Sequence, residues 1–190
     1  MHRSIVAALA ALALVPLAGC GDKTSDTAAA DTESAKVSSG TLAGEIGSAA
    51  GMTTVATALK GTGLAGIFDG SAPYTLLAPD DDAFGALGET GAMLKAPENG
   101  AAMAEVLKSH ILPGYVTVAD IDAAIKRAEG KPVKMTTMDG AELSFARNGE
   151  DLTVTAADGS TAKVDGSELA ASNGVAIPID GVLKKVPAAG

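Results

Sequence analysis

Few side chains in this sequence could take part in covalent or acid–base chemistry. Cys20 is the only cysteine, and His110 is the only histidine apart from His2. Three carboxylates stand side by side at positions 80–82. A single cysteine excludes a disulfide within the chain and a zinc site built on cysteines. Any chemistry must therefore depend on Cys20, on His110 or on carboxylates.

The triplet Asp80, Asp81 and Asp82 has two interpretations. A calcium loop requires acidic ligands at alternating positions, a turn glycine and a distal glutamate, and this pattern does not follow the triplet. Aspartate before a helix accepts hydrogen bonds from backbone N–H groups and favours the positive end of the helix dipole. We therefore predict that the triplet caps a helix that includes Phe84, and we expect no metal and no cofactor.

His110 is the one histidine available in the body of the chain. It follows Met103, Val106 and Leu107 at the spacing of one helix face. The favoured interpretation is a buried, hydrogen-bonded side chain, with a role in interaction second and catalysis or metal binding last. His110 and Tyr115 are the candidate interaction residues.

Motifs for catalysis do not accompany His110. A serine nucleophile needs a base and an orienting acid, and the sequence contains no Gly-x-Ser-x-Gly motif. Its 23 glycines do not form a phosphate-binding loop of the P-loop or dinucleotide type. We expect a protein that is not an enzyme, and a hydrolase is retained only as a third hypothesis.

The N-terminus has the features of an export signal. Arg3 precedes an apolar run over 5–15, which is too short to span a bilayer as a helix. The sequence Leu-Ala-Gly-Cys at 17–20 resembles the lipobox of bacterial lipoproteins. The resemblance implies a signal peptide over 1–19, cleavage before Cys20 and lipid on that cysteine, where two or more acyl chains hold firmly. An ordinary secretory signal is the alternative.

The segment 20–40 continues with small polar residues that show no hydrophobic period. Such a composition buries too little apolar area to order itself, so we predict a flexible tether after the lipidated cysteine. The remaining residues, 41–187, are long enough for one domain.

Helical patterns fill the first half of this domain and short strands fill the second. We predict helices that begin near Thr41 and Asp80 and others over 53–60, 101–111 and 117–129, with a strand over 74–78. Thr117 is the expected N-cap of the last helix, with Asp120 at the acidic position of a capping box. Further strands are expected over 133–138, 142–147, 152–155, 161–164, 175–179 and 182–186. Asp139-Gly140 and Asn148-Gly149 are hairpin signals. The order favours an α+β domain with a mainly antiparallel sheet.

Three blocks resemble the fasciclin (FAS1) domain family: 74–84, which includes Pro79, Asp80 and Phe84; 107–114 around His110; and 173–183, with Asn173, Gly174 and Asp180. They stand in the family's order and spacing over about residues 41–187. The resemblance implies a FAS1-like α+β fold, with helices packed on a wedge of strands. It also implies structural roles for Asn173-Gly174 in a tight turn and for Asp180 in satisfying backbone donors.

Two positions depart from the family pattern. Ser109 stands where a tyrosine usually precedes the histidine, and 176–178 lacks the usual histidine of the last block. In some animal members the tyrosine–histidine region takes part in receptor adhesion.

The resemblance and the export signal together predict a lipid-anchored, non-catalytic binding module of the cell envelope, in adhesion or in protein or matrix association. Its expected partners are the membrane, through lipid on Cys20, and an unidentified envelope or extracellular protein or glycan. The alternative is an extracytoplasmic small-ligand carrier with a crevice between helices and strands. We expect a place outside the cytoplasm, and Gly21 after the cysteine favours the outer membrane. The net charge of −9 argues against nucleic acid.

Overall fold

A computed structural model of the protein describes residues 37–186. The predicted signal peptide over 1–19, Cys20 and most of the predicted tether lie outside these residues. Over 37–186, no helix combines the length and the apolar character that crossing a bilayer requires.

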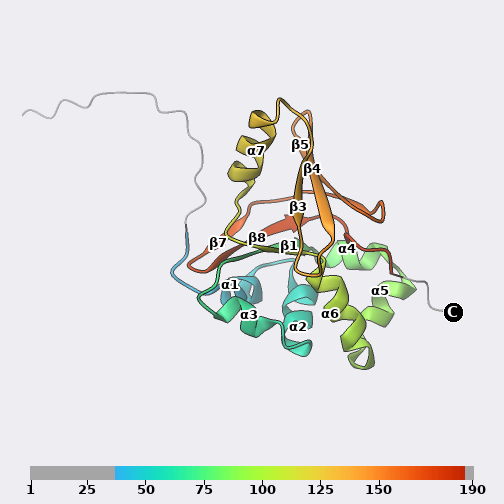
Figure 1. Ribbon diagram of the computed structural model, residues 1–190. Coiled ribbons are helices and arrows are strands. Elements are labelled where there is room, and N and C mark those ends of the chain that lie inside the picture. The colour runs from blue at the N-terminus through green and yellow to red at the C-terminus, as the bar shows by residue number, and fades with distance from the viewer. Residues whose placement is uncertain (1–36, 187–190) are drawn as a thin grey trace, which may run out of the picture. The chain divides into compact units, whose positions relative to one another are not determined.

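Helices form the first half of the domain, on one side of a central sheet (Figure 1). They are α1 (Leu42–Ser48), α2 (Thr53–Gly61), α3 (Ala65–Asp69), α4 (Asp81–Ala86), α5 (Glu89–Leu94), the 3₁₀ turn η1 (Pro97–Asn99) and α6 (Gly100–Lys108). The helix predicted to begin near Thr41 is confirmed, and the hydroxyl of Thr41 caps it by accepting a hydrogen bond from the N–H of Gly44.

The central sheet, sheet A, has the strand order β2 (Ile111–Pro113), β1 (Tyr74–Pro79), β8 (Gly174–Ile179) and β7 (Leu169–Ala171). β1 and β8 run parallel, and the other two pairs are antiparallel. Leu76 packs with the helices, whereas Leu77 packs with the second sheet. Burial on both faces explains why β1 and β8 are continuous apolar runs instead of alternating ones.

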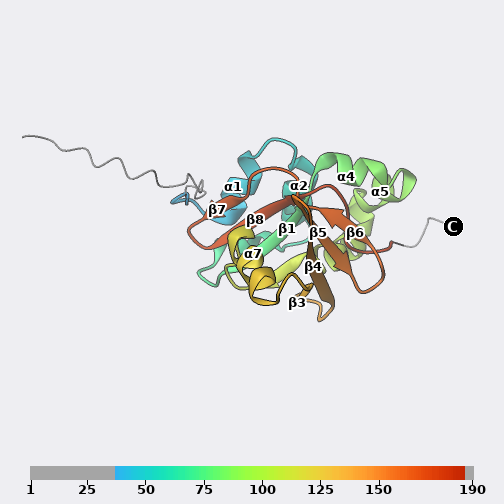
Figure 2. The same cartoon turned by 90° about the horizontal axis from the view of Figure 1, so that it is seen from above.

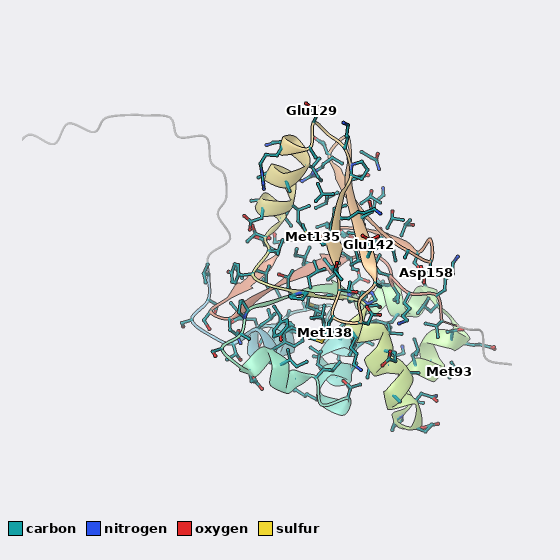
Figure 3. All side chains as sticks on the ribbon, viewed as in Figure 1. Met93, Glu129, Met135, Met138, Glu142 and Asp158 are labelled. Carbon is teal, nitrogen blue, oxygen red and sulfur yellow. The ribbon has the colours of Figure 1, made fainter. Side chains whose placement is uncertain are left out.

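Sheet B has the strand order β3 (Val133–Thr136), β4 (Glu142–Asn148), β5 (Asp151–Ala156) and β6 (Thr161–Lys163), and all of its pairs are antiparallel. Helix α7 (Val118–Arg127) lies alongside β3 and β4 (Figure 2). Sheet B and α7 together form a wedge. Glu129 lies at the tip of this wedge, far from helices α1–α6 (Figure 3). The strands alternate between buried and more exposed residues, as one-sided packing requires.

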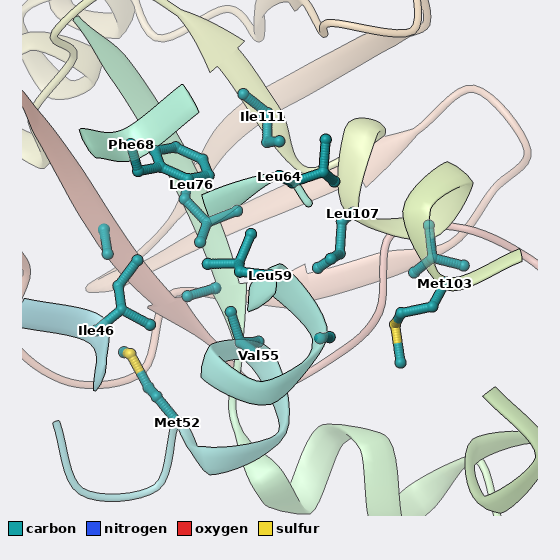
Figure 4. Packing of buried hydrophobic residues seen from close by; sticks show 14 of the residues in the cluster. Ile46, Met52, Val55, Leu59, Leu64, Phe68, Leu76, Met103, Leu107 and Ile111 are labelled. Carbon is teal, nitrogen blue, oxygen red and sulfur yellow. The ribbon is translucent and has the colours of Figure 1, made fainter. Parts of the chain in front are cut away.

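Two apolar clusters fill the interior, one on each side of sheet A. In the helical cluster, Val55 and Leu59 of α2 meet Leu107 of α6 and Leu76 of β1 (Figure 4). In the wedge cluster, Phe145 of sheet B is fully buried among residues of α7 and of the second face of sheet A. The expected α+β organisation, with helices packed on mainly antiparallel strands, is confirmed.

Several predicted elements are confirmed closely. Thr117 and Asp120 form the reciprocal capping box at the start of α7. Asp139-Gly140 joins β3 to β4, and Asn148-Gly149 joins β4 to β5. Gly149 has a φ of 66°, a conformation that glycine adopts without steric cost.

Two predicted elements are wrong in part. The helix predicted over 101–111 ends at Lys108, because Ile111 and Leu112 pair with β1 as strand β2. The strand predicted over 182–186 does not form. The N–H groups of Leu183 and Lys185 donate to the side chains of His110 and Asp158 instead of to a neighbouring strand.

Other differences concern short elements. The sequence patterns did not predict α5 or the three-residue strand β7. Part of the segment assigned to the tether also joins the domain. The N–H of Ser38 donates to the carbonyl of Ala170, and the N–H of Ser172 donates to the carbonyl of Gly40. Ser38, three residues before the predicted boundary at residue 41, therefore already contacts the domain.

Candidate functional site

His110 lies at the junction between α6 and β2 and is completely buried. Its Nε2 accepts a hydrogen bond from the N–H of Leu183 at 2.8 Å. Nε2 therefore carries no proton, and Nδ1 donates its proton to the carbonyl of Val106 at 2.7 Å. Both ring nitrogens are used, which matches the interpretation of His110 as a buried, hydrogen-bonded residue.

Burial also controls the charge of His110. The loss of hydration lowers the pKa of its imidazole from 6.5 to about 4, although the hydrogen bond to Val106 and the charge of Asp139 act in the opposite direction. The ring is therefore neutral at physiological pH. Since no ring atom reaches the surface, a direct interaction role for His110 is incompatible with the folded structure.

Ser109 is the hydroxyl closest in sequence to this imidazole. Its Oγ lies 3.3 Å from Nδ1 of His110, but it donates to the carbonyl of Val106 at 2.7 Å. A general base must have a free lone pair directed at the nucleophile, and here Nδ1 carries the proton. Ser109 is also only 3% exposed, so this pair does not have the geometry of a nucleophile and its base.

Tyr115 lies five residues after His110 but has the opposite environment. Its side chain is 37% exposed, and only Val37 joins it as an exposed large hydrophobic residue over 37–186. Partial burial raises the pKa of its phenol, and the negative charge of Glu168 adds to the effect. The phenol therefore stays protonated and can donate a hydrogen bond at the surface.

The loop that presents Tyr115 is fixed on both sides by one buried residue. Thr75 of β1 donates its hydroxyl to the carbonyl of Gly114 at 2.9 Å and accepts a hydrogen bond from the N–H of Val116 at 2.8 Å. Beyond the loop, Glu168 accepts a hydrogen bond from the N–H of Val118, the first residue of α7. Tyr115 is thus held in place by the sheet and by the start of α7.

The acidic triplet caps helices, as the sequence indicated. Asp80 accepts a hydrogen bond from the N–H of Ala83 and caps α4. Asp81 accepts hydrogen bonds from the N–H groups of Thr53 and Thr54 and so caps α2 as well. The hydrogen bond from the Thr54 side chain, followed by those backbone bonds, lowers the pKa of the Asp81 carboxyl. Over the described residues, no three histidine, aspartate or glutamate side chains come close enough together to hold a metal ion.

The residues of the last block hold distant segments together. Asn173 accepts a hydrogen bond from the N–H of Leu42 and donates to the carbonyls of Phe68 and Gly70. Pro79 pairs with Ile179 at the end of the parallel strands, and Phe84 is completely buried. Asp180 accepts a hydrogen bond from the N–H of Lys163, which ties the end of β8 to β6. Asp180 thus accepts from a backbone donor, which lies 17 residues away in the sequence.

A pocket of about 340 Å³ opens in the helical part between α2, α5 and α6. No sequence pattern indicates this pocket, because its lining comes from separate helices and the segment between α5 and α6. The crevice expected for a small-ligand carrier was placed between helices and strands, and this pocket lies among helices alone.

Comparisons with known proteins agree with this architecture. A model of the fasciclin domain family matches residues 50–185. Protein sll1483 of Synechocystis sp. is 30% identical over 132 residues, which are 69% of this chain and 66% of that protein. Uncharacterized protein sll1735 of the same organism is 28% identical over 96 residues, which are 50% of this chain and 71% of that protein.

A solved structure shares the fold. It is a FAS1 domain pair from the insect cell adhesion molecule Fasciclin I, with a TM-score of 0.67 and 16% sequence identity. The match covers 78% of this chain and 52% of that one. Because the family model covers more than half of the chain, the protein belongs to the fasciclin (FAS1) domain family.

Proposed function

We propose that this protein is a lipid-anchored, non-catalytic binding module of the cell envelope, which mediates adhesion or association with proteins or matrix. FAS1 domains are typically extracellular adhesion modules, and the solved domain pair of the same fold comes from a molecule named for cell adhesion. The lipobox-like sequence at 17–20 supports export and a lipid on Cys20 that holds the domain outside the cytoplasm.

The observation that carries the proposal is the exposed aromatic side chain of Tyr115, on a loop whose backbone is held by Thr75. Tyrosine is enriched among residues that dominate binding energy at interfaces, because it offers a large apolar surface and one hydrogen-bonding group. Thr75 holds the backbone on both sides of it, so little conformational entropy is lost on binding. Tyr115 is therefore the anchor that we assign to the partner-binding surface.

The experiment compares cells that carry the full chain with Tyr115→Ser or Tyr115→Phe. We expect Tyr115→Ser to reduce cell retention on the surface of a biofilm by about tenfold, as for the loss of one interfacial anchor. Tyr115→Phe should retain most of the binding because it keeps the ring. Lys60→Ala, at an exposed position of α2, serves as the surface control. Equal retention with and without residues 41–187 would contradict the proposal.

The anchor has a separate test. Mass spectrometry of the N-terminal peptide from the membrane fraction should give a start at Cys20 with diacylglycerol and acyl groups. Cys20→Ser should move the protein to the soluble fraction, because the acyl chains provide the membrane affinity. An unmodified Cys20 thiol, or a start at another residue, would exclude lipid anchoring.

A carrier of small ligands is the second candidate, and the pocket among α2, α5 and α6 is the observation that favours it. Its volume lies at the lower end of the range for pockets that hold small molecules, about 300–1,000 Å³.

A further inference from the structure

The pocket has a rigid apolar floor. Ala58 of α2, Leu94 of α5 and Met103 of α6 line it, and each is at most 9% exposed. All three belong to the helical core cluster, and Met103 lies beside that cluster in Figure 4. A floor made of core side chains keeps its shape without a ligand, which lowers the cost of binding.

The rim of the pocket is polar and carries one kind of charge. Thr53 and Thr57 are exposed residues of α2 at the rim, and Lys95, an exposed residue directly after α5, is the one charged residue of the lining. No aspartate or glutamate lines the pocket, although the chain has 23 acidic and 14 basic residues. Over 37–186, the ammonium of Lys95 forms no salt bridge. The charge of Lys95 is therefore available to a ligand.

The surroundings of Lys95 favour an anion. Gly100, the first residue of the nine-residue α6, also lines the pocket, and no acidic residue occupies the first turn of that helix. Gly61 and Thr62, at the C-terminal end of α2, line the pocket as well, so helix ends of both signs meet there and the full charge is that of Lys95. The nearby carboxylate of Asp81 is used by the N–H groups of Thr53 and Thr54.

We propose that this pocket binds a small organic anion with an apolar body, such as a medium-chain carboxylate. The apolar body lies on Leu94 and Met103, and the carboxylate pairs with Lys95 and reaches the hydroxyl of Thr57. This inference goes beyond adhesion through Tyr115, and it gives the alternative carrier function a site and a class of ligand.

The test uses octanoate, its neutral counterpart 1-octanol and the full chain with Cys20→Ser, which needs no detergent. Methionine methyl groups labelled with ¹³C report binding by NMR, with Met103 inside the pocket and Met135 of sheet B as an internal reference (Figures 3 and 4). We expect octanoate to shift the Met103 signal saturably and to leave Met135 unchanged. 1-Octanol should bind about fivefold more weakly, because it lacks the charge that pairs with Lys95.

Three variants locate the site. Lys95→Gln should weaken octanoate about fivefold and leave 1-octanol unchanged. Lys60→Gln, which removes an exposed lysine of α2 outside the pocket, should change neither affinity. Thr57→Trp, at an exposed position of the rim, should abolish the Met103 response to both compounds without changing adhesion through Tyr115.

Several outcomes of these titrations would overturn the proposal or a part of it. Equal affinity for octanoate and 1-octanol, or equal losses in Lys95→Gln and Lys60→Gln, would overturn the anionic ligand class. A saturable Met103 response that persists in Thr57→Trp would overturn the pocket as the site. The absence of any Met103 response to both compounds would overturn the proposal as a whole, and it would leave the adhesion experiment unaffected.

Discussion

The two sheets of the domain face different surroundings. Sheet A is covered on both sides, and every residue of β8 is buried. Sheet B packs through alternate residues, so that Leu143 and Phe145 are buried while Ser144 and Ala146 between them are partly exposed. A strand with two buried faces has no position that can change size freely, whereas a one-sided strand has a tolerant face.

The residues that carry the resemblance to the family follow this difference between the two sheets. Pro79, Asn173 and Gly174 lie on or beside sheet A, and His110 immediately precedes its strand β2. These residues join segments that are far apart in the sequence, such as Asn173 with Leu42. Sheet B is built from hairpins between neighbouring strands, which local turn sequences can specify. Substitutions should therefore cost more in and around sheet A than in sheet B.

The largest effect is expected for Gly174→Ala in β8. A Cβ atom there would lie 2.4 Å from the carbonyl oxygen of Tyr74 and 2.9 Å from Cδ2 of Leu42. Because the first of these atoms belongs to the backbone of a paired strand, relief requires β1 and β8 to separate. We expect the free energy of unfolding to fall by about 4 kcal/mol in a urea titration.

Gly149→Ala, in the turn between β4 and β5, is the matched control. A Cβ atom at Gly149 would meet no atom within 4 Å, so the cost is limited to its φ of 66°. We expect a loss of about 1 kcal/mol. If Gly149→Ala cost as much as Gly174→Ala, the proposed difference between the two sheets would be wrong.

His110→Ala should give the next largest effect. The substitution leaves the N–H of Leu183 and the carbonyl of Val106 without these hydrogen bonds in a buried site, and it opens a cavity. At pH 7.5 we expect the free energy of unfolding to fall by about 3 kcal/mol. A loss below about 1 kcal/mol would show that water or a rearranged chain replaces the imidazole at little cost.

The effect of His110 should also depend on pH. Its pKa is about 4 in the folded protein and 6.5 as the ordinary value, so the unfolded chain takes up the proton first as the pH falls. The stability that the neutral imidazole contributes is therefore fully present above pH 6.5 and is lost as the pH falls from 6.5 to 4. At about 1.4 kcal/mol for each pH unit, the loss is at most about 3.5 kcal/mol.

Urea titrations at several pH values test this linkage. The gap in stability between the native protein and His110→Ala should narrow as the pH falls from 6.5 to 4. Four carboxyls have lowered pKa values in the folded protein, and their titration reduces its stability only below about pH 3.8. They belong to Asp81, Asp120, Asp139 and Asp158, which are present in both proteins. A gap that stays constant from pH 7.5 to 4 would contradict the buried, neutral imidazole.

Local chemistry explains which parts of the fold the sequence could predict. The capping box of Thr117 and Asp120 and the turn at Asn148-Gly149 act within a few residues, and both were predicted correctly. The helix predicted to extend to Ile111 failed because pairing of Ile111 with Leu76 outweighed the helical period. The strand expected over 182–186 failed because side chains from distant segments bind its N–H groups.

The candidate sites show the same limit. The helical spacing of His110 with its neighbours indicated burial, but its partner Leu183 lies 73 residues away. Nothing near Tyr115 in the sequence shows that Thr75, 40 positions earlier, fixes its loop. Contacts of this kind depend on the tertiary arrangement, so a single sequence can suggest the residue but not its environment.

A smaller effect than that of His110→Ala is expected for Arg147→Met in sheet B. Arg147 of β4 donates two hydrogen bonds to the carboxylate of Asp122 in α7, at 2.8 Å and 2.7 Å. The two side chains are 32% and 27% exposed, so water replaces much of the lost interaction. We expect the free energy of unfolding to fall by about 1 kcal/mol.

Lys134→Met, at the neighbouring strand β3, is the control for this ion pair. Lys134 and Glu142 are 66% and 58% exposed, so the loss should stay below about 0.5 kcal/mol. The two variants together measure how much the contact between α7 and sheet B depends on polar groups at the surface. A loss for Arg147→Met as large as that for His110→Ala would mean that the wedge is held as strictly as sheet A, since only a buried, fully used contact costs that much.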